Sequence, residues 1–439
     1  MTRFERTRRQ ALLDGLFGAG WLGLRALATG LPVSLLARPR AARAADCAMP
    51  AAAQYLILST SQGGDPLNAN APGTYDFPGI AHSADPAMAK TALSLGGKSY
   101  DAAKPWSTLP QAILDRASFF HHATLTNSHA NQAKVQRLMG ATARQEMMVS
   151  VFAKALAPCL GTIQNEPVVV GANGSGELLS YEGRTLPRLS PRGLRDTLSN
   201  PAGPLGNLQK IRDADLDRMN ALFKQHGNNV QRAFLDRLAL SQREARGISQ
   251  QLLENLAGIT SDDATGQATA AAVLIKMNVS PVVSIHIPFG GDNHTDADLA
   301  RETAETVSGV AAIGLLMQKL AEYGLSDRVT FAAMNVFGRT LGTKGTRGRD
   351  HLANHHVTLM IGKRIRSSVI GGLEPKAGDF GARAIDSRAG AGAAAGAGDI
   401  PFEETLGAMG KTLGAALGVP ANVLDDNISV GKPVTAALI

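Results

Sequence analysis

The sequence is poor in the residues that hold small secreted scaffolds together. It has two cysteines in 439 residues, and aromatic residues make up only 5% of the chain. A disulfide-rich miniature fold is therefore excluded. Hydrophobic residues account for 44% of the chain, which is enough to bury a sizeable core and excludes wholesale disorder. The length allows one large α/β domain or two smaller ones.

The chain also lacks long apolar runs and, beyond its N-terminal region, any excess of charge. No segment reaches the roughly 20 apolar residues that cross a bilayer, so no transmembrane helix is predicted in the mature chain. Residues 1–45 contain eight arginines and two acidic residues. The remaining chain has 36 basic and 35 acidic residues. The formal net charge of +7 therefore comes mainly from the N-terminal region, and nucleic-acid binding is not predicted.

This N-terminal region is typical of a twin-arginine export signal. Arg8-Arg9 precedes a weakly apolar stretch that is interrupted by Arg25, and Ala42-Arg43-Ala44 is a small-residue cleavage site. We expect a signal peptide over residues 1–45 and export to the periplasm or the extracellular space. The alternative is an ordinary amphipathic, arginine-rich helix.

The two cysteines allow one disulfide. Cys47 follows the predicted cleavage site, and Cys159 lies between a proline and a leucine. An oxidising compartment would permit a bond between them. The sequence alone does not place them at bridging distance, so the pairing stays open.

The rest of the chain, residues 46–439, is predicted to form a single α/β domain with a helical insertion at about 205–260. Short apolar runs bounded by turn residues predict buried strands at 54–60, 117–124, 167–171, 282–287, 328–333 and 357–361. Helical periodicity is found at 130–157, 205–256, 297–323 and 403–417. The strand–helix–strand order between residues 282 and 333 favours a mainly parallel central sheet flanked by helices.

Several common catalytic motifs are missing. The near-matches to a phosphate-binding loop at 97–99 and 410–412 lack the first glycine that the loop requires. No G-x-S-x-G or H-E-x-x-H sequence occurs. Nucleotide binding, a serine hydrolase of the α/β type and a zincin protease are therefore disfavoured.

Acidic residues and histidines instead gather on predicted loops at the carboxyl ends of strands, where ligands collect in parallel sheets. Carboxylate and imidazole donors suit a divalent metal such as Zn²⁺ or Mn²⁺. The alternative is that these polar residues satisfy backbone amides at the rim of the sheet. The candidate metal ligands are Asp65, Asp292, His294, Asp350, His351, His355 and His356.

Six segments in combination resemble the bacterial secreted family known as domain of unknown function 1501. They are Gly63–Asn68, Ser128-His129, Gly291–His294, Asn335–Thr340, Gly348–His351 and Gly371-Gly372. The family is related to the alkaline phosphatase/sulfatase superfamily, so the resemblance implies an alkaline-phosphatase-like α/β fold and a site with two metals. Val336 stands where the family usually has an acid, which bears on catalytic competence.

The resemblance leads us to expect Asp65, Asp350 and His351 around one ion. Asp292, His294 and either His355 or His356 would hold the other, because adjacent residues on a strand point to opposite faces.

The candidate nucleophile is Ser128, with Thr126 as the competing hydroxyl, and Arg339 is expected to steady a bound anion. In a purely structural interpretation, Ser128 caps the helix that begins near Asn131. Two functions follow. The first is an exported metal-dependent hydrolase-like protein that acts on a phosphate or sulfate ester, with a small-molecule ester or an envelope component as its partner. The second is a non-catalytic exported binding or cell-envelope protein on the same scaffold.

Overall fold

The computed structural model describes residues 51–171, 179–199, 209–229, 231–232, 235–236, 239, 250–342, 347–394 and 396–439. The predicted signal peptide over residues 1–45 and Cys47 lie outside this part. Cys159, near the end of helix α7 (Met148–Leu160), is disulfide-bonded, and Cys47 is the chain's other cysteine. Within the described part, no helix is long and apolar enough to cross a membrane.

A single eight-stranded sheet forms the centre of the fold. Its order is β14 (Ser368–Ile370), β4 (Ala117–His122), β13 (His356–Ile361), β10 (Val329–Asn335), β1 (Tyr55–Ser61), β9 (Val282–Ile285), β5 (Val168–Val170) and β8 (Arg188–Leu189). Five of the seven neighbouring pairs are parallel, and β13 runs antiparallel to both of its neighbours. The prediction of a mainly parallel central sheet flanked by helices is confirmed.

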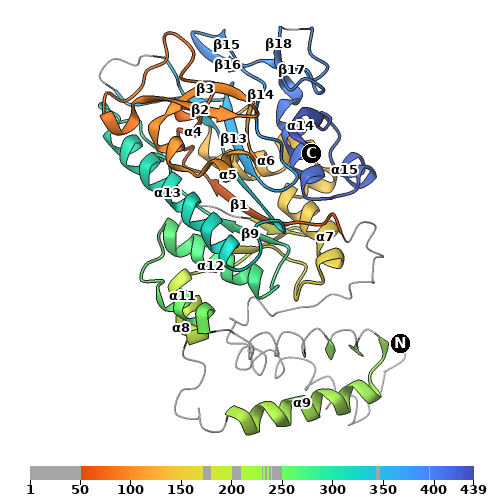
Figure 1. The fold of residues 1–439 in the computed structure, drawn as a ribbon. Helices are drawn as coiled ribbons and strands as arrows, with labels where there is room; N and C mark the ends of the chain where they lie inside the picture. The colour runs from red at the N-terminus through yellow and green to blue at the C-terminus, as the bar shows by residue number, and fades with distance from the viewer. Residues whose placement is uncertain are drawn as a thin grey trace.

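Helices cover both faces of this sheet (Figure 1). Helices α12 (Ala264–Lys276) and α13 (Ala300–Glu322) pack against each other on one side, while α7 and α14 (Thr405–Ala416) lie on the other. All seven residues of β1 are buried, as expected for a strand covered on both faces. The other α-helices in the described residues are α4 (Leu67–Asn70), α5 (Gln111–Leu114), α6 (Gln132–Gln136), α8 (Pro191–Ser199), α9 (Gln209–His226), α11 (Gln250–Ala257) and α15 (Ala421–Asn427).

Three segments differ from what the sequence predicts. The helix expected at 130–157 forms only in part. Helix α7 covers its second half, but before α7 the chain makes short turns, because Leu138, Met139, Arg144 and Gln145 have positive φ angles. Helix α12 was not predicted, since it is buried on nearly all sides and carries no amphipathic period. The hairpin of β2 (Lys90–Leu95) and β3 (Lys98–Ala103) was not predicted either.

Four histidines are fully buried where strands β4 and β13 pair, namely His121, His122, His355 and His356. Two of them, His355 and His121, belong to a chain of hydrogen bonds in which every donor points in the same direction, from Asn68 to Pro72. Asn68 Nδ2 donates to His355 Nδ1 at 3.3 Å, and His355 Nε2 donates to His121 Nδ1 at 2.9 Å. His121 Nε2 then donates to the carbonyl of Pro72 at 3.0 Å. Each ring in this chain uses one nitrogen as donor and one as acceptor, so both rings are neutral.

This histidine group should make the fold sensitive to acid. Burial lowers the pKa of His121 and His122 to about 4, and it lowers the pKa of His355 and His356 well below the usual value. In the unfolded chain a histidine pKa is about 6.5. The unfolded chain therefore binds more protons than the folded one between pH ~6.5 and ~4, and the free energy of unfolding falls as the pH falls through this window.

Urea unfolding at several pH values between about 7 and 4 measures this effect. Each histidine that stays neutral in the fold should contribute a slope of about 1.4 kcal/mol per pH unit. His121→Gln should lower stability at pH 7 and make the slope shallower, whereas His226→Gln, at an exposed position of α9, should leave the slope unchanged. An unchanged slope in His121→Gln would contradict this assignment.

Candidate metal centre

The candidate site lies at the edge of the sheet where the parallel strands end. The chain leaves β1 into Gln62–Asp65, leaves β4 toward Ser128 and leaves β9 toward Asp292. Strand β11 (Gly338–Arg339) follows β10 and pairs with β12 (His351–Leu352). Because the carboxyl ends of parallel strands share an edge, loops that are far apart in the sequence meet there.

Five side chains meet at this edge and form what we call the Asp/His cluster: His129, Asp292, His294, Asp350 and His351. His294 Nε2 lies 2.7 Å from His351 Nε2, and His294 Nδ1 lies 3.1 Å from Asp350 Oδ1. Asp292 Oδ2 is 3.4 Å from His129 Nε2, and Asp292 Oδ1 is 3.4 Å from His294 Nε2. The three rings are half-buried and the two carboxylates are exposed. The cluster is therefore fixed by the fold and open to solvent.

Each imidazole of the cluster donates from Nδ1 to an oxygen. His129 Nδ1 donates to Gln62 O at 2.5 Å, and His351 Nδ1 donates to Asn127 O at 2.6 Å. His294 Nδ1 donates to the Asp350 carboxylate. In the neutral rings this assignment leaves the Nε2 lone pairs as acceptors, and Arg339 Nη1 lies 3.5 Å from the Nε2 atom of His294. The lone pairs of His294 and His351 then face each other, which is repulsive unless a proton or another cation lies between them.

The distances within the cluster fit one divalent cation. Ligand atoms on a tetrahedral zinc with bonds of 2.0–2.1 Å lie about 3.3 Å apart. The ligand atoms of His129, Asp292 and His351 all lie within 4.8 Å of one another. The 2.7 Å between His294 and His351 is shorter than two ligands of one ion allow, so these rings would separate slightly if both bound. Burial lowers the pKa of His351, and the Arg339 guanidinium and the neighbouring histidines add to the shift, which disfavours a proton at this position.

Arg339 is fully buried beneath the cluster. Its Nη2 donates to Asp292 Oδ1 at 2.9 Å and to Gly63 O at 2.5 Å, and its Nε donates to Gly64 O at 2.5 Å. Burial by itself would raise the pKa of Asp292, but the Arg339 guanidinium lowers it below the usual value. The prediction that Arg339 steadies a bound anion does not match this placement, because its guanidinium already contacts protein oxygens and His294 Nε2.

Asp65 lies below the cluster and organises the loop after β9. Its side chain is fully buried, and its Oδ1 accepts hydrogen bonds from the backbone N–H groups of Phe289 and Gly291, both at 2.9 Å. Its Oδ2 is 3.4 Å from His286 Nε2. Burial would raise the pKa of Asp65, but the hydrogen bonds from His286 and the two amides lower it to about 2. The structure thus gives Asp65 protein partners instead of a place around an ion.

His355 and His356 are also kept out of the cluster. His355 is held between Asn68 and His121, as described above, and His356 Nε2 accepts from the backbone N–H of Asn335 at 3.0 Å. Of the seven candidate ligands, the structure brings together Asp292, His294, Asp350 and His351. His129 joins them and was not among the predicted ligands, although it belongs to the Ser-His pair that the sequence singled out.

Ser128 stands at the N-cap position of a short 3₁₀ turn, His129–Asn131, but its side chain makes no capping hydrogen bond. Thr126 holds this turn instead, because its Oγ1 accepts from Ser128 N at 3.3 Å and from Asn131 Nδ2 at 2.8 Å. The capping interpretation of Ser128 is therefore not supported. Of its two neighbours in the chain, His129 belongs to the cluster and Asn127 accepts a hydrogen bond from His351. Ser128 therefore lies at the edge of the cluster.

A segment that contains most of this site is similar to a known protein family. Residues 192–387 match the family model described as "Protein of unknown function (DUF1501)". The match includes every residue of the Asp/His cluster except His129. Among solved structures, the lipoteichoic acid synthase LtaP from Listeria monocytogenes is 9% identical with a TM-score of 0.36, over 95% of this chain and 82% of that chain. So low a score identifies no activity. No curated protein matches the chain.

The DUF1501 match also contains a buried ion pair that the sequence analysis missed. Glu302, in the first turn of α13, accepts from Arg349 at 2.7 Å and 3.0 Å, and both side chains are buried. Its carboxylate also accepts from Asn293 at 2.9 Å and from Asn70 at 3.0 Å. Asn293 lies between two cluster residues, and Arg349 directly precedes Asp350. The pair therefore joins the two loops that carry most of the cluster.

Glu302→Gln should lower the free energy of unfolding by about 3–5 kcal/mol, because the variant keeps the shape of the side chain but leaves Arg349 buried without a counter-charge. Urea unfolding measures the change. The control is Lys363→Met, which removes an exposed ion pair with Asp327 and should cost about 0–1 kcal/mol. Equal losses in the two variants would show that burial does not set the strength of the Glu302–Arg349 pair.

Proposed function

We propose that this protein is an exported, divalent-metal-dependent hydrolase-like protein that acts on a phosphate or sulfate ester at the Asp/His cluster. The observation that carries the proposal is the orientation of the rings. The Nε2 lone pairs of His294 and His351 point at each other across 2.7 Å. The Nδ1 atoms of the two rings donate instead to the Asp350 carboxylate and to the carbonyl of Asn127. A mixed set of imidazole and carboxylate donors suits Zn²⁺ or Mn²⁺.

A bound divalent cation would polarise an ester oxygen and lower the pKa of a hydroxyl or a water molecule. The chain's own residues supply the rest. Asp292 and the Nε2 atoms of the rings would hold the cation, and the backbone carbonyls of Gln62 and Asn127 keep two of those rings from rotating. Ser128 offers a hydroxyl beside the cluster that no capping bond engages. Because Arg339 is committed to protein oxygens, the charge of the ester is left to the cation and the histidines.

A non-catalytic binding role on the same scaffold is the second candidate. It is favoured by the commitment of Arg339 and Asp65, whose hydrogen bonds go to the protein itself. Transition states of phosphoryl transfer are usually stabilised by cationic donors aimed at the developing charge. In this alternative the cluster binds a metal ion or a component of the cell envelope without turnover.

Turnover of 4-nitrophenyl phosphate and 4-nitrophenyl sulfate with added Zn²⁺ or Mn²⁺ separates the two candidates. Ser128→Ala should lower turnover at least about 100-fold, because the nucleophile is removed, and should leave metal content and stability nearly unchanged. The control is Ser308→Ala, which removes an exposed hydroxyl on α13 and should keep turnover. Wild-type protein that holds metal but turns over neither ester would favour the binding role.

We also propose export by the twin-arginine route, on the basis of the sequence of residues 1–45. Changing Arg8 and Arg9 together to lysine keeps the charge but removes the arginine pair. Unprocessed protein should then accumulate in the cytoplasm, as followed by immunoblotting of cell fractions. The same change at Arg3 and Arg6 is the matched control and should leave processing intact. Normal processing of the Arg8/Arg9 variant would rule out this route.

A further inference from the structure

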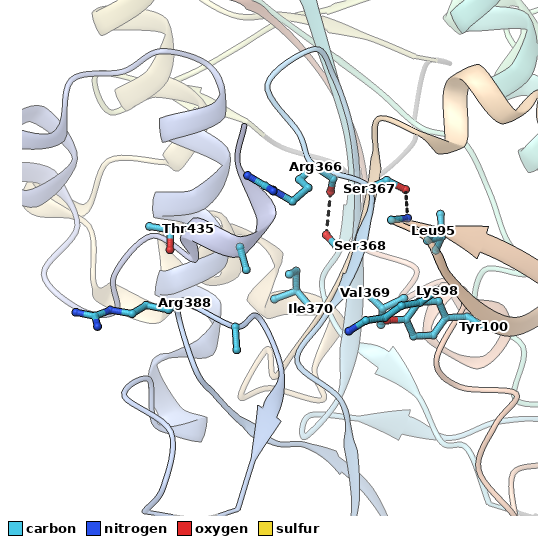
Figure 2. Close-up of a pocket in the computed structure, with 13 residues that line it drawn as sticks. Leu95, Lys98, Tyr100, Arg366, Ser367, Ser368, Val369, Ile370, Arg388 and Thr435 are labelled. Atoms are coloured by element: carbon cyan, nitrogen blue, oxygen red, sulfur yellow. Dashed lines mark hydrogen bonds between the residues drawn. The ribbon is translucent and has the colours of Figure 1, made fainter.

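A cavity of about 350 Å³ lies along β14 at the edge of the central sheet (Figure 2). Four parts of the chain line it: the hairpin of β2 and β3, strand β14 with the residues before it, the segment 388–389, and the segment 435–436. None of its lining residues belongs to the Asp/His cluster. Its volume lies within the usual range of small-molecule sites.

Hydrogen bonds fix the walls of this cavity. Gly96 N donates to Ser367 Oγ at 3.0 Å, and Ser367 Oγ donates to Leu114 O at 2.7 Å. Gly96 has a φ of +58°, and a Cβ there would lie 2.3 Å from Ser367 O, so the hairpin turn needs glycine to approach β14 this closely. On the opposite wall, Thr435 Oγ1 donates to Ser387 O at 3.2 Å. The cavity is therefore preformed.

The charged residues of the lining are all basic: Lys98, Arg366 and Arg388. Arg366 is held in place, because its Nε and Nη2 donate to Leu438 O at 3.1 Å and 3.0 Å. In Figure 2, Lys98 lies on one side of Ile370 and Arg388 lies on the other. The lining contains no carboxylate that would balance these three cations.

Other exposed basic residues of the chain do have carboxylate partners. Lys363 pairs with Asp327 and Lys432 pairs with Asp399, both at 3.0 Å. Within the described part of the chain, no ion pair involves the three basic residues of the cavity. Three like charges around one preformed cavity raise its positive potential, and an anion bound there would relieve their repulsion.

We propose that this cavity binds a small phosphate-bearing organic molecule, at a site separate from the Asp/His cluster. Arginine and lysine together are the usual protein donors for a phosphate group. Tyr100 and Ile370 add apolar surface to the lining, which suits the organic part of such a molecule and which inorganic phosphate would leave uncovered. The site does not depend on the proposed hydrolase function.

Isothermal titration with glucose 6-phosphate tests the proposal, with EDTA present so that the Asp/His cluster holds no metal. Wild-type protein should bind glucose 6-phosphate with a dissociation constant of about 1 mM or lower, and it should bind it more tightly than inorganic phosphate. The double variant Lys98→Met/Arg388→Met should bind at least about tenfold more weakly, because charge-assisted hydrogen bonds are lost. The matched control, Lys363→Met/Lys432→Met, removes the same charge outside the cavity and should bind as wild type does.

Three results would overturn the proposal. The first is the absence of glucose 6-phosphate binding by the wild-type protein. The second is an equal loss of affinity in the cavity variant and in the charge-matched control, which would indicate a general effect of net charge. The third is a loss of binding in His351→Gln but not in the cavity variant, which would place the ligand at the Asp/His cluster. Circular dichroism of each variant confirms that it is folded.

Discussion

The buried guanidinium of Arg339 is the interaction on which the candidate site depends. It donates to the carbonyls of Gly63 and Gly64 after β1 and to the carboxylate of Asp292 after β9. Asn68 in turn holds the backbone of Arg339, accepting from its N–H at 2.9 Å and donating to its carbonyl at 2.8 Å. One side chain thus fixes the loop after β1 and the loop after β9 relative to its own strand, β11. A buried charge in this position needs all of these acceptors, because a guanidinium without partners is costly to remove from water.

Around this centre, charge and hydrogen bonds set the orientation of each functional group. The Glu302–Arg349 pair fixes the loop that carries Asp292 and the loop that carries Asp350. Backbone carbonyls take the Nδ1 protons of His129 and His351, so that their Nε2 atoms face the inside of the cluster. A site built in this way is organised before any ligand arrives, which is the arrangement that electrostatic catalysis requires. The same rigidity would serve a protein that only binds its ligand.

The sequence predicts those parts of the structure that rest on local patterns. The apolar runs of β1, β9 and β10 indicate buried parallel strands, and residues just beyond strand ends, such as Asp292, are placed correctly at the sheet edge because the topology determines that edge. Helix α12 carries no such local signal, since it is buried nearly all round. Asp65 and His355 are kept out of the cluster by hydrogen bonds to residues hundreds of positions away, such as Gly291 and His121. No local sequence pattern therefore separates them from the cluster residues.

The most direct measurement is a titration of the metal-free protein with Zn²⁺, followed by calorimetry. If the Asp/His cluster is a metal centre, the wild-type protein should bind zinc at one site, and His351→Gln should bind it at least about tenfold more weakly, because replacing residues around a metal site typically costs 10–100-fold in affinity. His226→Gln, which changes an exposed histidine far along the chain, should bind zinc as the wild type does. Equal affinity in His351→Gln and the wild type, or no binding by either, would contradict the assignment of this cluster as a metal centre.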